Sequence, residues 1–242
     1  VAVFKALISE VEGWDSRTRF HTYFHENQFV YPGHLPKRSQ HQFTAINFTT
    51  ALASDRIAFN SNYNRDTFCG QCRKYLSKAV DMEMVENIDA IEKKSTILYP
   101  GMDYTHLDEL NKIKGSGEIP VIIWNHRWEH DKNPEEFFEA CYRLRDEAVP
   151  FRLVILGQRF RDSPNCFSKA REGLQEQILH FGYVENKQDY YRLLSQGDYV
   201  VSTAHHEFFG ISVLEAVRAG CYPVLPERLS YPELYKKKYL YK

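Results

Sequence analysis

The chain has 242 residues, of which 43% are hydrophobic and 26% charged, the composition of an ordinary globular protein. No apolar run approaches the roughly 18–20 residues of a membrane-spanning helix, and a formal net charge of −1 excludes a globally basic nucleic-acid-binding protein. The five cysteines are an odd number with no disulfide spacing, so we expect a reducing, cytoplasmic environment.

The first 105 residues (1–105) have the pattern of part of a Rossmann-like domain. Strands are predicted at 21–27, 55–61 and 95–101, and helices at 38–53 and 63–78. Three strands are too few for a stable doubly wound domain, so we expect this N-terminal domain to be incomplete in the chain.

A polar run ends the first predicted strand, at the edge where a cleft between two domains is expected. It consists of His25, Glu26, Asn27 and Gln28. Such a group could bind a transferred sugar and its acceptor. His25 could instead cap a loop carbonyl.

A linker is predicted at 106–118 because Gly115, Ser116 and Gly117 interrupt the pattern there. Over 119–242 the pattern alternates, with strands predicted at 120–125, 151–157, 178–182, 198–203 and 221–225 and helices near 134–147, 164–176, 186–196 and 210–219. Apolar strands alternating with helices indicate a parallel sheet covered on both faces, a second Rossmann-like domain that we expect to be cut short at its end. Asn133 and Pro134 are typical N-cap and N1 residues of its first helix.

Two carboxylates, Glu207 and Glu215, lie eight residues apart across a predicted strand-to-helix turn. Glu207 is expected on the loop after the strand and Glu215 about one turn inside the helix. The helix N-terminus between them offers unpaired N–H groups and a positive dipole end, which suit a phosphate. The segment therefore predicts a site for a sugar nucleotide.

Two cations, Arg127 and Lys132, follow the first strand of the C-terminal domain. At the carboxyl edge of a parallel sheet they would neutralise a diphosphate and stabilise it as a leaving group. The alternative is that they are surface charges paired with Glu129, Asp131 or Glu135. Phe208 and Phe209 could likewise wall a donor site or simply pack.

The string S-T-A-H-H-E-F-F-G-I-S-V-L-E-A-V-R-A-G-C-Y-P-V-L (202–225) resembles the E-x7-E signature of retaining GT-B glycosyltransferases of family 4. The five-residue spacing of Arg127 and Lys132 matches the donor-diphosphate pair of that family. H-F-G-Y-V (180–184) resembles its turn near the nucleobase.

This resemblance implies a role for each residue of the motif. Glu207 would approach the donor sugar, Glu215 the ribose, and the backbone at Gly210 and Ile211 the sugar or phosphate. It also implies front-face substitution, in which the leaving phosphate helps to take the acceptor proton. Glu207 and His25, which corresponds in position to a loop histidine of related enzymes, would be the catalytic residues. Glu207 would position groups or stabilise charge, His25 would not be a general base, and no metal would be obligatory.

Three further strings are together similar to the tRNA-queuosine alpha-mannosyltransferase group: Y-F-H-E-N-Q-F-V-Y-P (23–32), N-H-R-W-E-H-D-K-N-P-E-E-F-F (125–138) and A-H-H-E-F-F-G (204–210). The similarity implies transfer of a hexose, mannose from GDP-mannose, to queuosine in a tRNA anticodon. Alternatives are a family 4 enzyme for a small-molecule, lipid or polysaccharide acceptor, and a non-catalytic module that binds sugar nucleotides or RNA. Contact with tRNA would use local basic clusters such as Lys37/Arg38 and Lys236–Lys238.

A zinc site is the weakest reading of the sequence. Cys69 and Cys72 have the spacing of one half of such a site, but no second pair follows and they fall in a predicted helix. We expect no metal.

Overall fold

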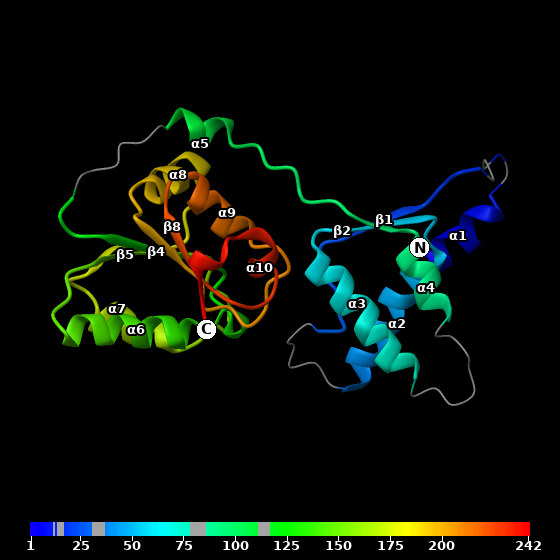
Figure 1. Cartoon of the computed structure of the whole chain (residues 1–242), viewed down its shortest axis with the longest axis horizontal. Helices are drawn as coiled ribbons and strands as arrows, with labels where there is room; N and C mark the ends of the chain where they lie inside the picture. The colour runs from blue at the N-terminus through cyan, green and yellow to red at the C-terminus, as the bar shows by residue number, and fades with distance from the viewer. Residues whose placement is uncertain (12, 14–16, 31–36, 78–85, 111–116) are drawn as a thin grey trace. The chain divides into compact units, whose positions relative to one another are not determined.

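Parallel strands make up both sheets of the chain, which divides into two units, Val1–Pro100 and Gly101–Lys242 (Figure 1). The computed structural model describes residues 1–11, 13, 17–30, 37–77, 86–110 and 117–242. All strand pairs in this part of the chain run parallel, which confirms the predicted α/β class with Rossmann-like sheets.

The first unit contains a sheet in the order β1-β2-β3. Its strands are β1 (His21–Phe24), β2 (Arg56–Phe59) and β3 (Ser95–Ile97), and its helices are α1 (Ala2–Ser9), α2 (Lys37–Ala53), α3 (Asn62–Leu76) and α4 (Glu86–Lys93). The core is aromatic, since Phe24 stacks on Phe59 at 5.2 Å and both pack against Phe68. Ser61 caps α3 by accepting a 3.0 Å hydrogen bond from the Asn64 amide.

The second unit contains a sheet in the order β6-β5-β4-β7-β8-β9. Its strands are β4 (Val121–Asn125), β5 (Arg152–Leu156), β6 (Ile178–Gly182), β7 (Tyr199–Val201), β8 (Tyr222–Pro226) and β9 (Leu240–Tyr241). The chain moves outward from β4 to β6 and then returns to pair β7 with the other edge of β4. This reversal creates a switch point at the carboxyl ends of β4 and β7, where α/β sheets bind ligands.

Helices cover both faces of this sheet (Figure 1). They are α6 (Pro134–Asp146), α7 (Cys166–Gly173), α8 (Lys187–Ser195), α9 (Ile211–Arg218) and α10 (Tyr231–Leu234), with short 3-10 turns η1 (His130–Lys132) and η2 (Lys237–Tyr239). Alternate strand residues feed two cores. Trp124 packs with α6 and α7, whereas its neighbour Ile123 packs with α8 and α9.

Several expectations differ from the structure in detail. The strand expected at 21–27 ends at Phe24, and that at 198–203 covers only 199–201. Helices α1, α4 and α10 and strand β9 were not predicted. Pro134 does begin α6, but Asn133 adopts φ 50° and makes no side-chain cap; its amide instead bonds to Glu136.

A short helix, α5 (Thr105–Glu109), forms where the linker was expected to begin. Its Leu107 is buried in the core with α8 and α9, and its Asp108 pairs with Arg218 of α9 at 2.7 Å. Residues 111–116 of the predicted linker are outside the described residues. No described helix is both long and apolar enough to cross a membrane.

Candidate functional site

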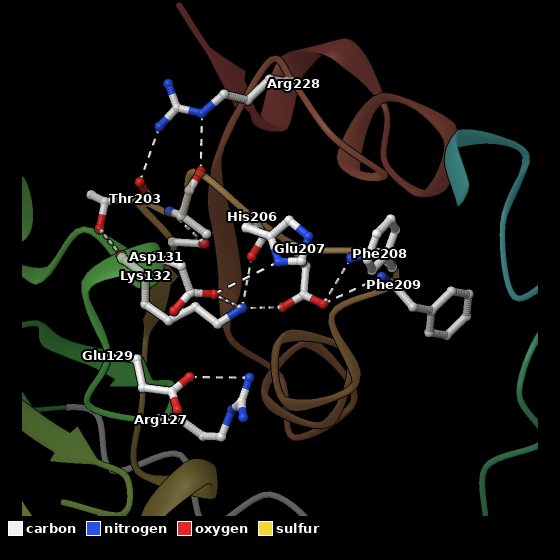
Figure 2. A network of polar contacts seen from close by, with 12 residues as sticks. Arg127, Glu129, Asp131, Lys132, Thr203, His206, Glu207, Phe208, Phe209 and Arg228 are labelled. Carbon is white, nitrogen blue, oxygen red and sulfur yellow. Dashed lines mark hydrogen bonds and ion pairs between the residues drawn. The ribbon is translucent and has the colours of Figure 1, made fainter. Parts of the chain in front are cut away.

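Two loops meet at the switch point, the loop after β4 and the loop after β7 (Figure 2). The amide of His205 donates to the Asp131 carbonyl at 2.8 Å. The Thr203 hydroxyl donates to the carbonyls of Lys132 and Asn133 at 3.0 and 2.7 Å. These backbone contacts fix residues far apart in sequence beside one another.

Lys132 is the centre of the polar network. Its side chain is only 7% exposed, and its ammonium donates to the His206 carbonyl at 2.7 Å. The same nitrogen lies 3.3 Å from a carboxylate oxygen of Glu207 and 3.3 Å from one of Asp131 (Figure 2). The ammonium therefore donates hydrogen bonds to His206 and Glu207 and forms an ion pair with Asp131, whose Oδ2 atom has no hydrogen-bond partner in the described part of the chain.

Glu207 is held as a carboxylate on the loop before α9. One oxygen accepts from the amides of Phe208 and Phe209 at 3.1 and 3.3 Å, and the other faces Lys132. Burial by itself would raise the pKa of Glu207, but the Lys132 ammonium, aided by the Phe209 amide, outweighs it and the pKa is lowered. The side chain is therefore ionised at neutral pH.

Two buried histidines flank this pair. Burial, reinforced by the positive charge of Lys132, lowers the pKa of both His126 and His206 to about 4. Both imidazoles are therefore neutral at physiological pH. His126 bonds to the backbone of Val201, and its Nε2 atom is buried with no hydrogen-bond partner in the described part of the chain.

Acidification should destabilise the second unit because of these histidines. An unfolded histidine, with a pKa near 6.5, binds a proton that the folded one refuses until about pH 4. The free energy of unfolding should therefore fall as the pH drops from 6.5 to 4, by up to about 3 kcal/mol for each histidine. Urea denaturation across this pH range measures the slope.

The neighbouring histidine supplies the control. His205 is exposed, whereas His206 is 6% exposed. His206→Gln should make the pH dependence shallower, and His205→Gln should leave it as in the wild type. Identical slopes in all three proteins would contradict this account.

A cavity of about 340 Å³ opens beside the network. It is lined by Asn125, His126, Arg127, Lys132, Leu156, Gly157, Gln158, Tyr183, Val184, Tyr190, Glu207 and Ser212. Asn125 donates to the Ser212 carbonyl at 2.7 Å and to the Tyr190 hydroxyl at 3.2 Å. The side-chain oxygen of Asn125, Oδ1, is buried and lacks a hydrogen-bond partner among the described residues. Together with His126 Nε2, this oxygen indicates a polar ligand.

The residues predicted to contact the donor divide into two sets. Arg127, Lys132 and Glu207 line this cavity, whereas Gly210, Ile211 and Glu215 do not. Arg127 lies at the cavity with its side chain 51% exposed and 3.1 Å from Glu129. Gly210 is the N-cap of α9 with φ 86°, and Ile211, the first residue of α9, is 44% exposed. Glu215 stands behind the wall, where the Tyr190 hydroxyl donates to it at 2.9 Å. Burial raises the pKa of Glu215.

The alternative that Arg127 and Lys132 pair with nearby carboxylates is correct in part. Arg127 does pair with Glu129 and Lys132 with Asp131, yet both also line the cavity. Phe208 and Phe209 are buried and are not cavity walls; they contribute their backbone amides to Glu207.

The polar run after β1 does not form one group. Asn27 is fully buried, and its amide donates to the Asn64 side chain at 2.9 Å. This holds the loop to α3, so the expected contact between Asn27 and an acceptor does not fit the structure. Glu26 and Gln28 share a 3.1 Å hydrogen bond at the surface, and exposed His25 stacks edge-on against Tyr23 at 4.6 Å.

The cysteine pair is part of a core. Cys69 and Cys72 lie in α3 against Phe68, and burial raises the pKa of both thiols, that of Cys69 to about 12. Among the described residues, no group of three or more His, Cys, Asp or Glu is placed to hold a metal ion.

Sequence reasoning missed several residues of the site, including Asn125, His126, Tyr190 and Ser212. Gly157 was also missed, although a glycine directly after a strand is a pattern that the sequence itself shows. It has φ 146°, and a Cβ there would lie 1.9 Å from the His126 carbonyl, so glycine is required where β5 meets the β4 loop. The others depend on which loops the sheet order brings together.

Comparison with known proteins agrees with this geometry. Residues 1–102 match the family described as tRNA-queuosine alpha-mannosyltransferase N-terminal, and residues 108–239 match glycosyl transferases group 1. The tRNA-queuosine alpha-mannosyltransferase of Drosophila melanogaster is 35% identical over 226 residues, which are 90% of this chain and 60% of the relative.

Two other proteins are more distant. The GDP-mannose:cellobiosyl-diphosphopolyprenol alpha-mannosyltransferase of Xanthomonas campestris is 23% identical over 82% of this chain and 47% of its own length. The crystal structure of Anabaena HepE in complex with UDP-glucose superposes with a TM-score of 0.65 over 97% of this chain and 59% of HepE, at 16% identity. The shared fold is that of GT-B glycosyltransferases.

The chain thus spans about 60% of the length of its curated Drosophila relative. The group 1 match covers more than half of the chain and includes every residue of the cavity. The chain therefore belongs to the glycosyl transferases group 1 family, and its first unit matches the N-terminal domain of tRNA-queuosine alpha-mannosyltransferases.

Proposed function

We propose that the protein is a retaining glycosyltransferase that moves mannose from GDP-mannose onto queuosine in a tRNA anticodon, in the cytoplasm. One observation carries the transferase chemistry: an ionised carboxylate, Glu207, with its side chain only 18% exposed, lines a cavity together with Arg127 and Ser212 of α9. The similarity to the Drosophila enzyme over both units supports the acceptor.

We propose that the donor diphosphate lies between Arg127 and the first turn of α9, at Gly210, Ile211 and Ser212. Arg127 is half exposed, so its guanidinium can turn from Glu129 toward a more highly charged partner. The N-terminal amides of α9 and the helix dipole add to the same attraction. No metal is part of this proposal.

Lys132 has a different position from Arg127. Its ammonium donates to the His206 carbonyl and to Glu207 and forms an ion pair with Asp131. We propose that it acts on the diphosphate mainly through its charge, while its direct contacts fix Glu207 toward the donor sugar. Glu215, which is held by Tyr190 behind the cavity wall, would meet the ribose after a change of rotamer.

In the first unit, we propose that His25, Glu26 and Gln28 contribute to acceptor binding from the surface after β1. A lipid-linked acceptor is the second candidate, favoured by the similarity to the Xanthomonas enzyme.

The donor is tested by thermal shift with GDP-, UDP- and ADP-sugars on the full-length protein. We expect GDP-mannose to stabilise the protein most, because a ligand that binds only the folded state raises its stability in proportion to the logarithm of its affinity. Greater stabilisation by a UDP- or ADP-sugar would overturn the GDP-mannose assignment.

Arg127→Ala should weaken donor binding about 10- to 150-fold, since losing a charge-assisted contact costs about 1.5–3 kcal/mol. Calorimetry with GDP-mannose measures the change. Arg143→Ala, which removes a surface ion pair with Glu139 on α6, is the matched control and should bind normally. Unchanged affinity in a folded Arg127→Ala protein would mean that Arg127 is only a partner of Glu129.

A further inference from the structure

A second cavity, of about 430 Å³, lies next to the donor cavity. The two share Gly157 and Tyr183 as a common wall. The two cavities open on different sides of the sheet. Tyr190 of α8 and Ser212 of α9 line the donor cavity. Residues of α7, which packs with α6 on the opposite face, line the second cavity (Figure 1). The second cavity thus lies on another face of the sheet, although Phe181, Gly182 and Tyr183, from the turn that resembles the nucleobase turn of family 4, line it.

The floor of this cavity is aromatic, and its Trp128 and Phe167 belong to the core with α6 and α7, where they are 5% and 3% exposed. Trp128 stacks on Phe167 with ring centroids 4.1 Å apart and planes 5° apart, and Phe181 meets Trp128 edge-on at 4.9 Å. A parallel backbone bridge between Trp128 and Arg159 joins the β4 and β5 loops. The exposed ring of Tyr183 stands at the rim.

The rim of this cavity is cationic. Arg159 comes from the β5 loop, and Arg171 lies with Ser168 and Glu172 on one face of α7. Both guanidinium groups are exposed, and neither has an ion-pair partner within the described ranges, although Glu172 lies at the same rim. Residues 157–173 contain four cations, Arg159, Arg161, Lys169 and Arg171, against two anions, Asp162 and Glu172, in a chain whose net charge is −1.

We infer that this second cavity binds an unpaired nucleotide of the acceptor RNA, with Arg159 and Arg171 on its phosphates and the base against the aromatic floor. This inference rests on the proposed function for the identity of the RNA. Aromatic surfaces bordered by arginines are how proteins bind single-stranded RNA. The carboxylate of Glu172 can accept a hydrogen bond from an amino group of the base.

The cluster expected from sequence fits this role less well. Lys236, Lys237 and Lys238 are exposed, but the Tyr222 hydroxyl bonds to the Lys238 carbonyl at 3.3 Å. Because Tyr222 begins β8, this places η2 at the amino end of that strand, opposite the edge with the donor cavity. The side chains of Lys37 and Arg38 lie outside the described residues.

The test measures RNA binding without any donor. Full-length protein is titrated into a fluorescein-labelled anticodon stem–loop RNA, followed by anisotropy at several salt concentrations. The double variant Arg159→Ala/Arg171→Ala should bind about 10- to 100-fold more weakly, with a log–log salt slope lower by about 1–2. Its affinity for GDP, measured by calorimetry, should be unchanged.

A charge-matched control is Arg143→Ala/Arg192→Ala, which removes two exposed arginines outside the cavity and outside the cationic segment 157–173. Its affinity for the RNA should fall by less than about threefold, from the change in net charge alone. Equal losses in the two double variants would overturn the site. Loss of GDP affinity in Arg159→Ala/Arg171→Ala would also overturn it, because the cavity would then hold the donor base.

Failure of the proposed function has a different signature. Sugar transfer to a lipid alone, with arginine-dependent RNA binding retained, would overturn the tRNA-directed function and support the site. Transfer to tRNA with unchanged RNA affinity in Arg159→Ala/Arg171→Ala would overturn only the site. A wild-type protein that does not bind the RNA would overturn both.

Discussion

Lys132→Met should destabilise the second unit by about 3–5 kcal/mol, the usual loss when one partner of a buried ion pair is removed. The substitution keeps an apolar stem of similar length but leaves the carboxylates of Asp131 and Glu207, 10% and 18% exposed, without the ammonium that lies 3.3 Å from each. The His206 carbonyl also loses its 2.7 Å hydrogen bond. Urea denaturation at pH 7 measures the change in the free energy of unfolding.

Two companion variants make this test specific. Lys169→Met removes an exposed lysine of α7 and should change the stability by less than about 0.5 kcal/mol. Asp131→Asn should offset part of the loss in a double variant with Lys132→Met, since one buried negative charge is then absent. A stability of Lys132→Met equal to that of Lys169→Met would show that the ion pairs contribute nothing.

Glu207→Gln should lower kcat by about 100- to 1000-fold and leave nucleotide affinity nearly unchanged. The amide has the shape of the carboxylate but cannot carry a negative charge. Burial opposes ionisation of Glu207, but Lys132 lowers its pKa, so the native side chain is charged at neutral pH. If Glu207 acts on the reacting sugar, the loss falls on the transition state. Steady-state kinetics with labelled GDP-mannose and calorimetry with GDP measure the two quantities separately.

Glu215→Gln is the comparison for this prediction. It alters a carboxylate held by Tyr190 on the nucleoside side of the cavity, so we expect it chiefly to weaken binding of the free nucleotide. If both substitutions only raised KM, the proposed division of roles between the two glutamates would be wrong.

The sequence predicted the parts of the site that depend on local pattern. Strand-to-helix alternation over 119–242 set the parallel sheet, and the loop position of Glu207 and helical position of Glu215 followed from spacing alone. The same reasoning could not predict that Lys132 contacts Glu207, because that contact requires β7 to pair with β4 and not to follow β6 at the edge.

The errors came from side chains whose partners are distant in sequence. Asn27 reads as a polar loop residue, yet α3 brings Asn64 to its amide, 37 residues away, and buries it. Tyr190 carries no signal of its own in the sequence, and its place beside Asn125 and Glu215 depends on the packing of α8 against α9. Burial and pairing of this kind follow from tertiary packing and not from a local motif.

The most direct test of the account gives the full-length protein labelled GDP-mannose and two matched tRNAs, one with and one without queuosine, followed by mass analysis of the nucleosides. The account predicts a hexose added to queuosine in the first tRNA and no label in the second. Equal labelling of both tRNAs, or labelling of neither alongside efficient transfer to a lipid or free sugar, would contradict it.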